Sequence, residues 1–230
     1  MSLSKGIWER SSFGGDTMSP RAYIASVSFF TVFGLVLATV VGFLARTWHL
    51  SWLSLIAVGF VVPLIGILIF TKSQDWFISL FGYTIMVIGL GAIMVPCVAT
   101  YKATAIMQAF AATAGTTIVT SVIGIIYPKS LEKWGTYLFG GLVALLLARI
   151  AQIIMIGIGM QSARGVWLWV EYPAALLFSL YIIYDWNRAL RLNHTLDNAV
   201  DCAGAIFLDI INLFLKFLRI FGGSGSSSRK

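Results

Sequence analysis

The sequence predicts an all-α integral membrane protein. Of its 230 residues, 59% are hydrophobic and only 11% are charged, and the mean hydropathy is +0.90. This composition is typical of proteins that cross the membrane several times. Six apolar runs are long enough to span a hydrocarbon core, which takes about 20 residues. These runs cover residues 22–45, 50–71, 76–100, 104–126, 134–158 and 165–186.

A seventh run, residues 203–221, is shorter and more polar than the other six. It contains Asp209, Asn212, Lys216 and Arg219, so it suits a helix that the others shield from lipid. We therefore expect six transmembrane helices and a shorter, central seventh helix at the C-terminal end. Asp209, Asn212 and Lys216 recur at helical spacing on one face. This polar stripe is expected to line a pore or to join a buried hydrogen-bond network.

The segments outside the helices indicate the orientation of the chain. Residues 1–20 form a polar leader without the apolar core of a signal peptide, residues 21–222 form the membrane domain, and residues 223–230 form a Gly/Ser-rich tail expected to be disordered. Basic residues are more numerous in the leader and in the connections on its side of the membrane. The positive-inside rule therefore places the N-terminus in the cytoplasm, in the inner membrane if the protein is bacterial. The net charge of +7 reflects this topology, and no nucleic-acid partner is expected.

Asp185 and Asp209 are the strongest candidates for functional residues. A carboxylate within an apolar segment costs several kcal/mol unless it is paired, protonated or hydrated, so such residues usually serve a function. The sixth run ends near Trp186 and the seventh begins near Ala203. At about 1.5 Å per residue, Asp209 is then only about 9 Å inside the same membrane face. We expect the two aspartates to share one layer near the cytoplasmic mouth.

The chemistry of such a pair indicates a proton sensor. Two carboxylates held close together in a low dielectric cannot easily both ionise, so they share a proton and titrate as a coupled unit. The protonated pair is expected to form a hydrogen bond, whereas the ionised pair is expected to repel and to offer oxygen ligands to a hard cation. Calcium prefers six to eight oxygens, so Asp185 and Asp209 predict only weak, transient calcium binding. In the alternative interpretation, Asp185 is an interfacial residue and the positive N-terminal half of its own helix stabilises Asp209.

A second set of charges is expected to form an ion pair toward the outer face. We expect a turn near Gln161. Arg149 lies 12 residues before Gln161 and Glu171 lies 10 residues after it, so antiparallel helices would place the two side chains at similar depth. We predict an ion pair with a structural role between Arg149 and Glu171, with Gln152 one helical turn from Arg149. The alternative is an outer vestibule charge.

Two stretches of sequence carry a family resemblance. FSLYIIYDWN (Phe178 to Asn187) and FLDIINLFLKFLRIFG (Phe207 to Gly222) resemble the signature of the Bax inhibitor-1 family. The resemblance implies two three-helix groups around a central C-terminal helix and a pH-sensitive calcium leak. It also implies that Asp185 and Asp209 form a hydrogen-bonded pair that senses protons and closes the cytoplasmic side. Gln108 stands where other members often carry an acid, which places it among the polar residues of the ion path.

Three function classes remain after the motifs are considered. The sequence contains no phosphate-binding loop, no Ser/His/Asp set and no metalloprotease motif, so we expect neither an enzyme nor a pump, and no cofactor. The first class is a passive, proton-gated cation leak whose partners are the lipid bilayer, calcium ions and protons. The second is a non-conducting regulatory protein that binds and modulates a membrane protease or another membrane partner. The third is a proton-coupled transporter.

Overall fold

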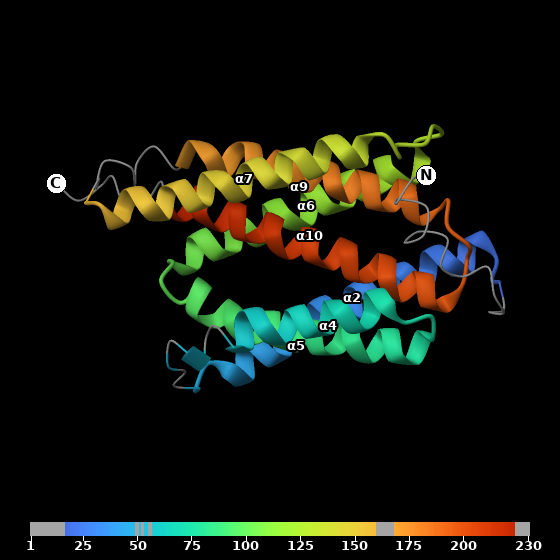
Figure 1. Ribbon diagram of the computed structural model, residues 1–230, viewed down its shortest axis with the longest axis horizontal. Coiled ribbons are helices and arrows are strands. Elements are labelled where there is room, and N and C mark those ends of the chain that lie inside the picture. Colours follow the sequence, from blue (N-terminus) through green and yellow to red (C-terminus); the bar gives the residue numbers. More distant parts are fainter. Residues whose placement is uncertain (1–16, 49–50, 52, 55–56, 160–167, 224–230) are drawn as a thin grey trace. The chain divides into compact units, whose positions relative to one another are not determined.

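Helices make up most of the part of the chain that the structure describes. The computed structural model describes residues 17–48, 51, 53–54, 57–159 and 168–223. Most of the predicted leader, residues 1–16, and the tail from residue 224 lie outside these residues. Every regular element that is described is a helix (Figure 1), so the predicted all-α class is confirmed. The helices are α2 (Pro20–Ala45), the π-helix η1 (Ala57–Val61), α4 (Val62–Lys72), α5 (Trp76–Val98), α6 (Ala103–Ile126), α7 (Trp134–Gly157), α9 (Leu168–Ala189) and α10 (Leu196–Gly223).

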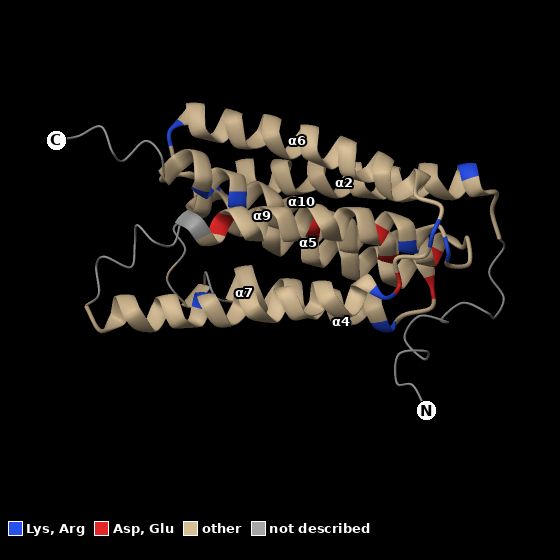
Figure 2. Cartoon of the chain, turned by 90° about the horizontal axis from the view of Figure 1, so that it is seen from above, with Lys and Arg blue, Asp and Glu red and all other residues tan. Residues whose placement is uncertain are grey.

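Four of the described helices are long and apolar enough to cross a membrane, which makes the chain a multi-pass membrane protein. They are α2, α5, α6 and α7, and a shorter apolar helical stretch covers Ala57–Lys72. Figure 2 shows that their long middle parts carry few charges and that Lys and Arg lie mostly near helix ends. Helix α9 is also long, at 22 residues, but it contains Glu171, Asp185 and Arg188, and these charges lower its mean hydropathy.

Short polar residues determine where two of the apolar helices begin. Ser19 caps α2, because its hydroxyl accepts a hydrogen bond from the amide of Ala22 at 3.3 Å. Asp75 caps α5 and accepts from the amides of Phe77 and Ile78 at 2.9 and 3.2 Å. Such side chains satisfy amides that have no partner within the helix. Polar residues between apolar runs therefore end one helix and start the next.

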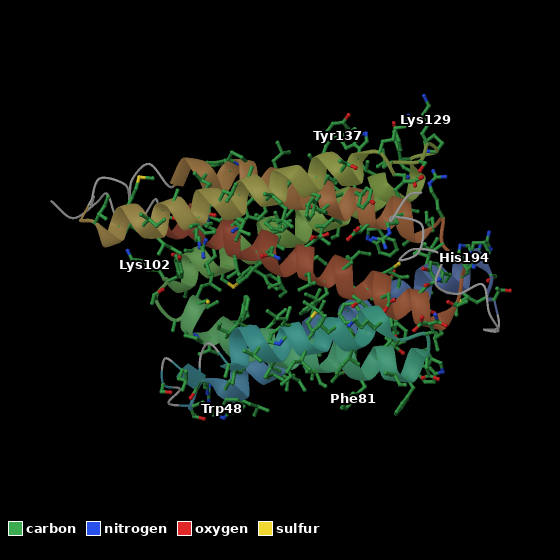
Figure 3. All side chains as sticks on the ribbon, viewed as in Figure 1. Trp48, Phe81, Lys102, Lys129, Tyr137 and His194 are labelled. Atoms are coloured by element: carbon green, nitrogen blue, oxygen red, sulfur yellow. The ribbon has the colours of Figure 1, made fainter. Side chains whose placement is uncertain are left out.

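The outer surfaces of the helices are strongly apolar. The side chains of Phe81 and Tyr137 project away from the helices that carry them (Figure 3), and both are exposed. Many large apolar side chains of α2, α4, α5, α6 and α7 are exposed in the same way. Water-soluble proteins rarely expose apolar surface on this scale, whereas a lipid environment accommodates it.

The chain forms two compact units. The first unit comprises residues 1–100 and 189–207, and the second comprises residues 101–188 and 208–230. Among the described helices, the first unit therefore contains α2, η1, α4, α5 and the first part of α10. The second contains α6, α7, almost all of α9 and the remainder of α10. A single helix, α10, contributes to both units.

Small residues allow the helices of the first unit to pack closely. A Cβ atom on Gly66 of α4 would lie 2.5 Å from the amide nitrogen of Met86 in α5, and one on Gly91 of α5 would lie 2.7 Å from the carbonyl oxygen of Ala38 in α2. Glycine at these positions lets two helix backbones approach each other, as is common in membrane proteins. The core of this unit is therefore held mainly by close apolar packing.

Helix α10 corrects one prediction. It has 28 residues and begins at Leu196, so the seventh helix is longer, not shorter, than the other described helices. The polar residues before Ala203 resemble a loop in the sequence, yet they are helical and partly buried. The hydroxyl of Thr195 accepts from the amide of Asn198 at 3.3 Å, and Asp197 accepts a hydrogen bond of 2.6 Å from Ser79. These partners satisfy polar groups that would otherwise favour a solvated connection.

Candidate functional site

The structure brings Asp185 and Asp209 together in the second unit. Asp185 lies on α9 and is 8% exposed, and Asp209 lies on α10 and is 7% exposed. A side-chain hydrogen bond links the two carboxyl groups. The expected distance of about 9 Å from the start of the helix is wrong for Asp209, because α10 begins at Leu196. Asp209 lies 13 residues further on, or about 20 Å along the helix axis.

Two contacts hold α9 in place around Asp185. A Cβ atom on Gly124 of α6 would lie 2.6 Å from the carbonyl oxygen of Ile183 and 2.8 Å from the Cβ atom of Trp186. Glycine therefore lets the backbone of α6 contact α9 on both sides of Asp185 in the sequence. This close contact fixes the part of α9 that presents the carboxylate.

The second contact is made by Asn187 of α9 with the connection between α6 and α7. Its Nδ2 atom donates to the carbonyl oxygens of Tyr127 and Lys129 at 3.0 and 3.1 Å, and its Oδ1 atom accepts from the amide of Leu131 at 3.0 Å. The sequence showed Asn187 only as part of the family motif and did not reveal this role. A buried amide near the end of an apolar helix is nevertheless a signal, because it carries both a donor and an acceptor that a neighbouring backbone can satisfy.

The surroundings of the aspartate pair favour a shared proton. Asp209 Oδ2 is buried and has no hydrogen-bond partner among the described residues. A buried carboxylate oxygen without a partner is costly, and protonation of one acid reduces that cost. The charge of Arg188 acts on Asp185, and the phenol of Tyr181 is near both aspartates. The arrangement can therefore hold a proton between two helices.

Glu171 is the centre of a second set of buried charges in the same unit. Its side chain is almost completely buried, and Arg149 Nη2 of α7 forms an ion pair with Glu171 Oε1. Arg219 Nη1 lies 3.3 Å from the same oxygen, and Lys216 Nζ lies 3.8 Å from Oε2. Gln152 Oε1 accepts from Arg149 Nη1 at 2.8 Å. We call Glu171, Arg149, Lys216 and Arg219 the Glu171 cluster.

The structure pairs Arg149 with Glu171, and it redistributes the polar stripe of α10. Lys216 joins a buried charge network, but its partner is Glu171 and its ammonium group lies 5.8 Å from the centre of the Phe178 ring. Asn212 donates to the carbonyl oxygen of Leu208 at 2.9 Å, within its own helix. Gln108 is exposed. A role of Gln108 among the polar residues of an ion path remains a prediction.

The physical reason for this redistribution is the difference in reach and charge between the side chains. Lys216 is long enough to contact a buried carboxylate on another helix, and opposite charge offsets part of the cost of burying its ammonium group. Asn212 is short, and its amide is satisfied by a carbonyl oxygen one turn earlier. Residues on one face of a helix thus acquire different partners.

The described residues do not contain a ready-made metal centre. Among residues 17–48, 51, 53–54, 57–159 and 168–223, no group of three or more His, Cys, Asp or Glu side chains is arranged to hold a metal ion. The aspartate pair by itself supplies two carboxylates. Weak calcium binding by Asp185 and Asp209 therefore remains a prediction.

The fold and the two buried charge sets define a helical, multi-pass membrane protein with ionisable groups inside its second unit. Comparison with known families assigns it more closely. Residues 20–226 match the family model described as "Inhibitor of apoptosis-promoting Bax1". The chain therefore belongs to the Bax inhibitor-1 family, as its motifs suggested.

Several bacterial proteins are similar to the chain. An uncharacterized membrane protein of Streptococcus pyogenes serotype M3 is 30% identical over 129 residues, which is 53% of each chain. An uncharacterized protein of Helicobacter pylori is 29% identical over 161 residues, 67% of this chain and 65% of the relative. The inner membrane protein YbhL of Escherichia coli is 28% identical over 131 residues, 53% of each chain. The chain thus spans about half to two thirds of the length of these relatives, and two of their names place them in a membrane.

Proposed function

We propose that the protein is a pH-sensitive passive cation leak, with calcium as the permeant ion, and that Asp185 and Asp209 form its proton-operated gate. The observation that carries this proposal is the hydrogen bond between two buried carboxyl groups on different helices. Membership of the Bax inhibitor-1 family supports it. The proposal contains no enzymatic step and no resident cofactor, and the partners are the bilayer, calcium ions and protons.

The proposed gate works through the charge of the pair. With one shared proton, the hydrogen bond ties α9 to α10 and closes the path. When the proton leaves, two negative charges face each other in a low dielectric, where their repulsion is much stronger than in water. The carboxylates then separate and offer oxygen ligands to a hard cation. The leak is therefore expected to increase as the cytoplasmic pH rises.

The proposal includes a finer arrangement of the helices. Six spans form two three-helix groups around α10, with the N-terminus in the cytoplasm and the protein in the inner membrane. The membership of the two units supports this grouping, because three helical stretches precede α10 in each unit and α10 belongs to both. The excess of Lys and Arg on one side supports the orientation.

Calcium flux in liposomes tests the proposal. The purified protein is reconstituted with a calcium-sensitive dye inside, and flux is measured over a range of outside and inside pH. Wild type should conduct more at higher pH on the cytoplasmic side, whereas Asp185→Asn and Asp209→Asn should lose this dependence because an amide cannot release the proton.

The matched control removes an exposed carboxylate of the same unit. Glu132 lies on the surface of the connection between α6 and α7, so Glu132→Gln should retain the pH response of wild type. Absence of flux at every pH would overturn the leak. An unchanged pH response in both aspartate variants would overturn the gate.

A further inference from the structure

Helices α9 and α10 are joined at two separate points within the second unit. The first point is the hydrogen bond between Asp185 and Asp209, and the second is the set of ion pairs from Lys216 and Arg219 to Glu171. Glu171 precedes Asp185 by 14 residues on α9, whereas Lys216 and Arg219 follow Asp209 on α10. The two points therefore occur in opposite order along the two helices, as expected for antiparallel neighbours.

Two points of attachment restrict the motion of α10 against α9 more than a single point does. A single hydrogen bond leaves one helix free to slide and rotate about that bond. Positions 14 residues apart on α9 are close to four full turns, about 21 Å, and therefore share one face of the helix. Asp209 and Lys216, seven residues apart, also share a face of α10. The second attachment therefore restricts both the axial position and the rotation of α10 against α9.

Glu171 is itself held by a third helix. Arg149 of α7 bonds Glu171 through one guanidinium nitrogen and Gln152 through the other. A guanidinium with two fixed acceptors has a defined plane, so it orients the carboxylate that it binds. Lys216 and Arg219 consequently contact a carboxylate whose position is set by α7 and α9 together.

The charges in direct contact with the aspartates differ from those of the Glu171 cluster. The groups that act most directly on Asp185 and Asp209 are the two aspartates themselves and Arg188. Tyr181 is near both aspartates, and Tyr184 is near Asp185, Arg188 and Glu132. The ion pairs of Lys216 and Arg219 with Glu171 give Glu171 a direct hold on the position of α10.

We propose that Glu171 is a positioning residue that holds α10, through Lys216 and Arg219, at the height where Asp209 meets Asp185. The Glu171 cluster is then the fixed end about which α10 moves when the aspartate pair separates. The inference rests on the proposed proton gate for its functional meaning. The position of α10 can nevertheless be measured without any flux.

Cross-linking between the two helices provides that measurement. Cys97 and Cys202 are first replaced by Ala, and Asp185→Cys and Asp209→Cys are then introduced together in the full chain. Because the two carboxyl groups are hydrogen-bonded, cysteines at these positions should cross-link readily under mild oxidation in liposomes. Adding Glu171→Gln should slow cross-linking several-fold, whereas adding Glu132→Gln should leave the rate unchanged.

A second variant breaks only the α10 attachment. Lys216→Gln combined with Arg219→Gln leaves the Arg149–Glu171 pair in place, and it should slow cross-linking like Glu171→Gln. Glu171→Asp retains the charge and should restore part of the rate. In the protein with both aspartates, Glu171→Gln should shift the pH at which flux rises, without removing the response.

Each outcome supports or overturns a distinct statement. An unchanged cross-linking rate in folded Glu171→Gln or in the double variant overturns the positioning role. If Glu171→Gln slows cross-linking but the wild type shows no pH-dependent flux, the positioning role is supported and only the proposed gate is overturned. If Glu171→Gln does not fold, the result for the double variant decides.

Discussion

The two halves of α10 are held in different ways. Residues 196–207 belong to the first unit and residues 208–223 to the second. In the first half, Phe207 is fully buried and meets Tyr83 edge to face at 5.9 Å, and the Tyr83 hydroxyl donates to the carbonyl oxygen of Phe30 at 2.9 Å. In the second half, Leu213 and Leu218 are also buried, but Asp209, Lys216 and Arg219 in addition contact α9 through ionisable groups.

This difference indicates which half of the helix can respond to conditions. The free energy of apolar packing depends on shape and buried area, which a change of pH does not alter. The free energy of carboxyl pairs and ion pairs depends on protonation. The Phe207 contact of the first half therefore stays in place when the pH changes, whereas the second half, which we call the charged half, can pivot at the Glu171 cluster as Asp209 separates from Asp185. The proposed gate lies in the charged half.

The largest expected effect comes from removing the main packed side chain of the first half. Phe207→Ala creates a cavity beside Tyr83 and should lower the free energy of unfolding by about 3–5 kcal/mol. The loss should be equal at pH 6 and pH 8 because no ionisable group is removed. Thermal unfolding of the protein in detergent measures both values.

The matched control for this variant is Phe29→Ala in the same unit. Phe29 is 64% exposed, so its removal leaves no cavity and should have little effect. A loss for Phe207→Ala that appears at only one pH would contradict the view that the Phe207 contact depends on shape and not on charge.

A smaller effect is expected from crowding the same contact. A Cβ atom on Gly34 of α2 would lie 1.8 Å from the hydroxyl oxygen of Tyr83 and 3.1 Å from a ring carbon of Phe207. Tyr83 is fully buried and hydrogen-bonded, so it cannot swing aside freely. Gly34→Ala should therefore destabilise the protein by about 1–3 kcal/mol. Thermal unfolding is again the measurement.

Gly115→Ala is the control, because a Cβ atom at Gly115 of α6 would have no neighbour within 4 Å. This variant should be neutral or slightly stabilising. If both alanine variants unfold at the same temperature, the packing of α2 against α5 and α10 is looser than these distances indicate.

The smallest effect is expected at the edge of the charged half. The Arg219 side chain is 43% exposed, and Glu171 retains its ion pairs with Arg149 and Lys216 when Arg219 is replaced. Arg219→Gln should therefore cost less than about 1 kcal/mol, as exposed ion pairs do, and this cost should shrink further in high salt. Unfolding at low and high ionic strength measures it.

Arg149→Gln provides the contrast within the same cluster, because Arg149 is less exposed and also bonds Gln152. It should destabilise the protein more than Arg219→Gln does. Equal effects of the two variants would indicate that the cluster does not depend on the Arg149 pair.

Much of the fold followed from the sequence because bilayer spans have simple requirements. Long apolar runs with polar ends specify helices whatever their neighbours are, and α2, α5, α6 and α7 agree with the predicted runs within a few residues. Counting residues from a common turn also brought Arg149 and Glu171 to the same depth. The start of α10 could not be found in this way, because Asp197 and Asn198 look like loop residues until buried partners such as Ser79 and Thr195 are known.

The sequence by itself determined the class of the protein, the position of its apolar helices and the two aspartates that are candidates for the gate, because a charge within an apolar segment can be recognised from the sequence alone. The tertiary structure alone decided the partners. It directed Lys216 and Arg219 to Glu171, satisfied Asn212 within its own helix and used Asn187 to hold the connection after α6. The reason is that a long charged side chain takes its partner from whichever neighbouring helix presents an opposite charge, and that neighbour is set by the packing of the helices.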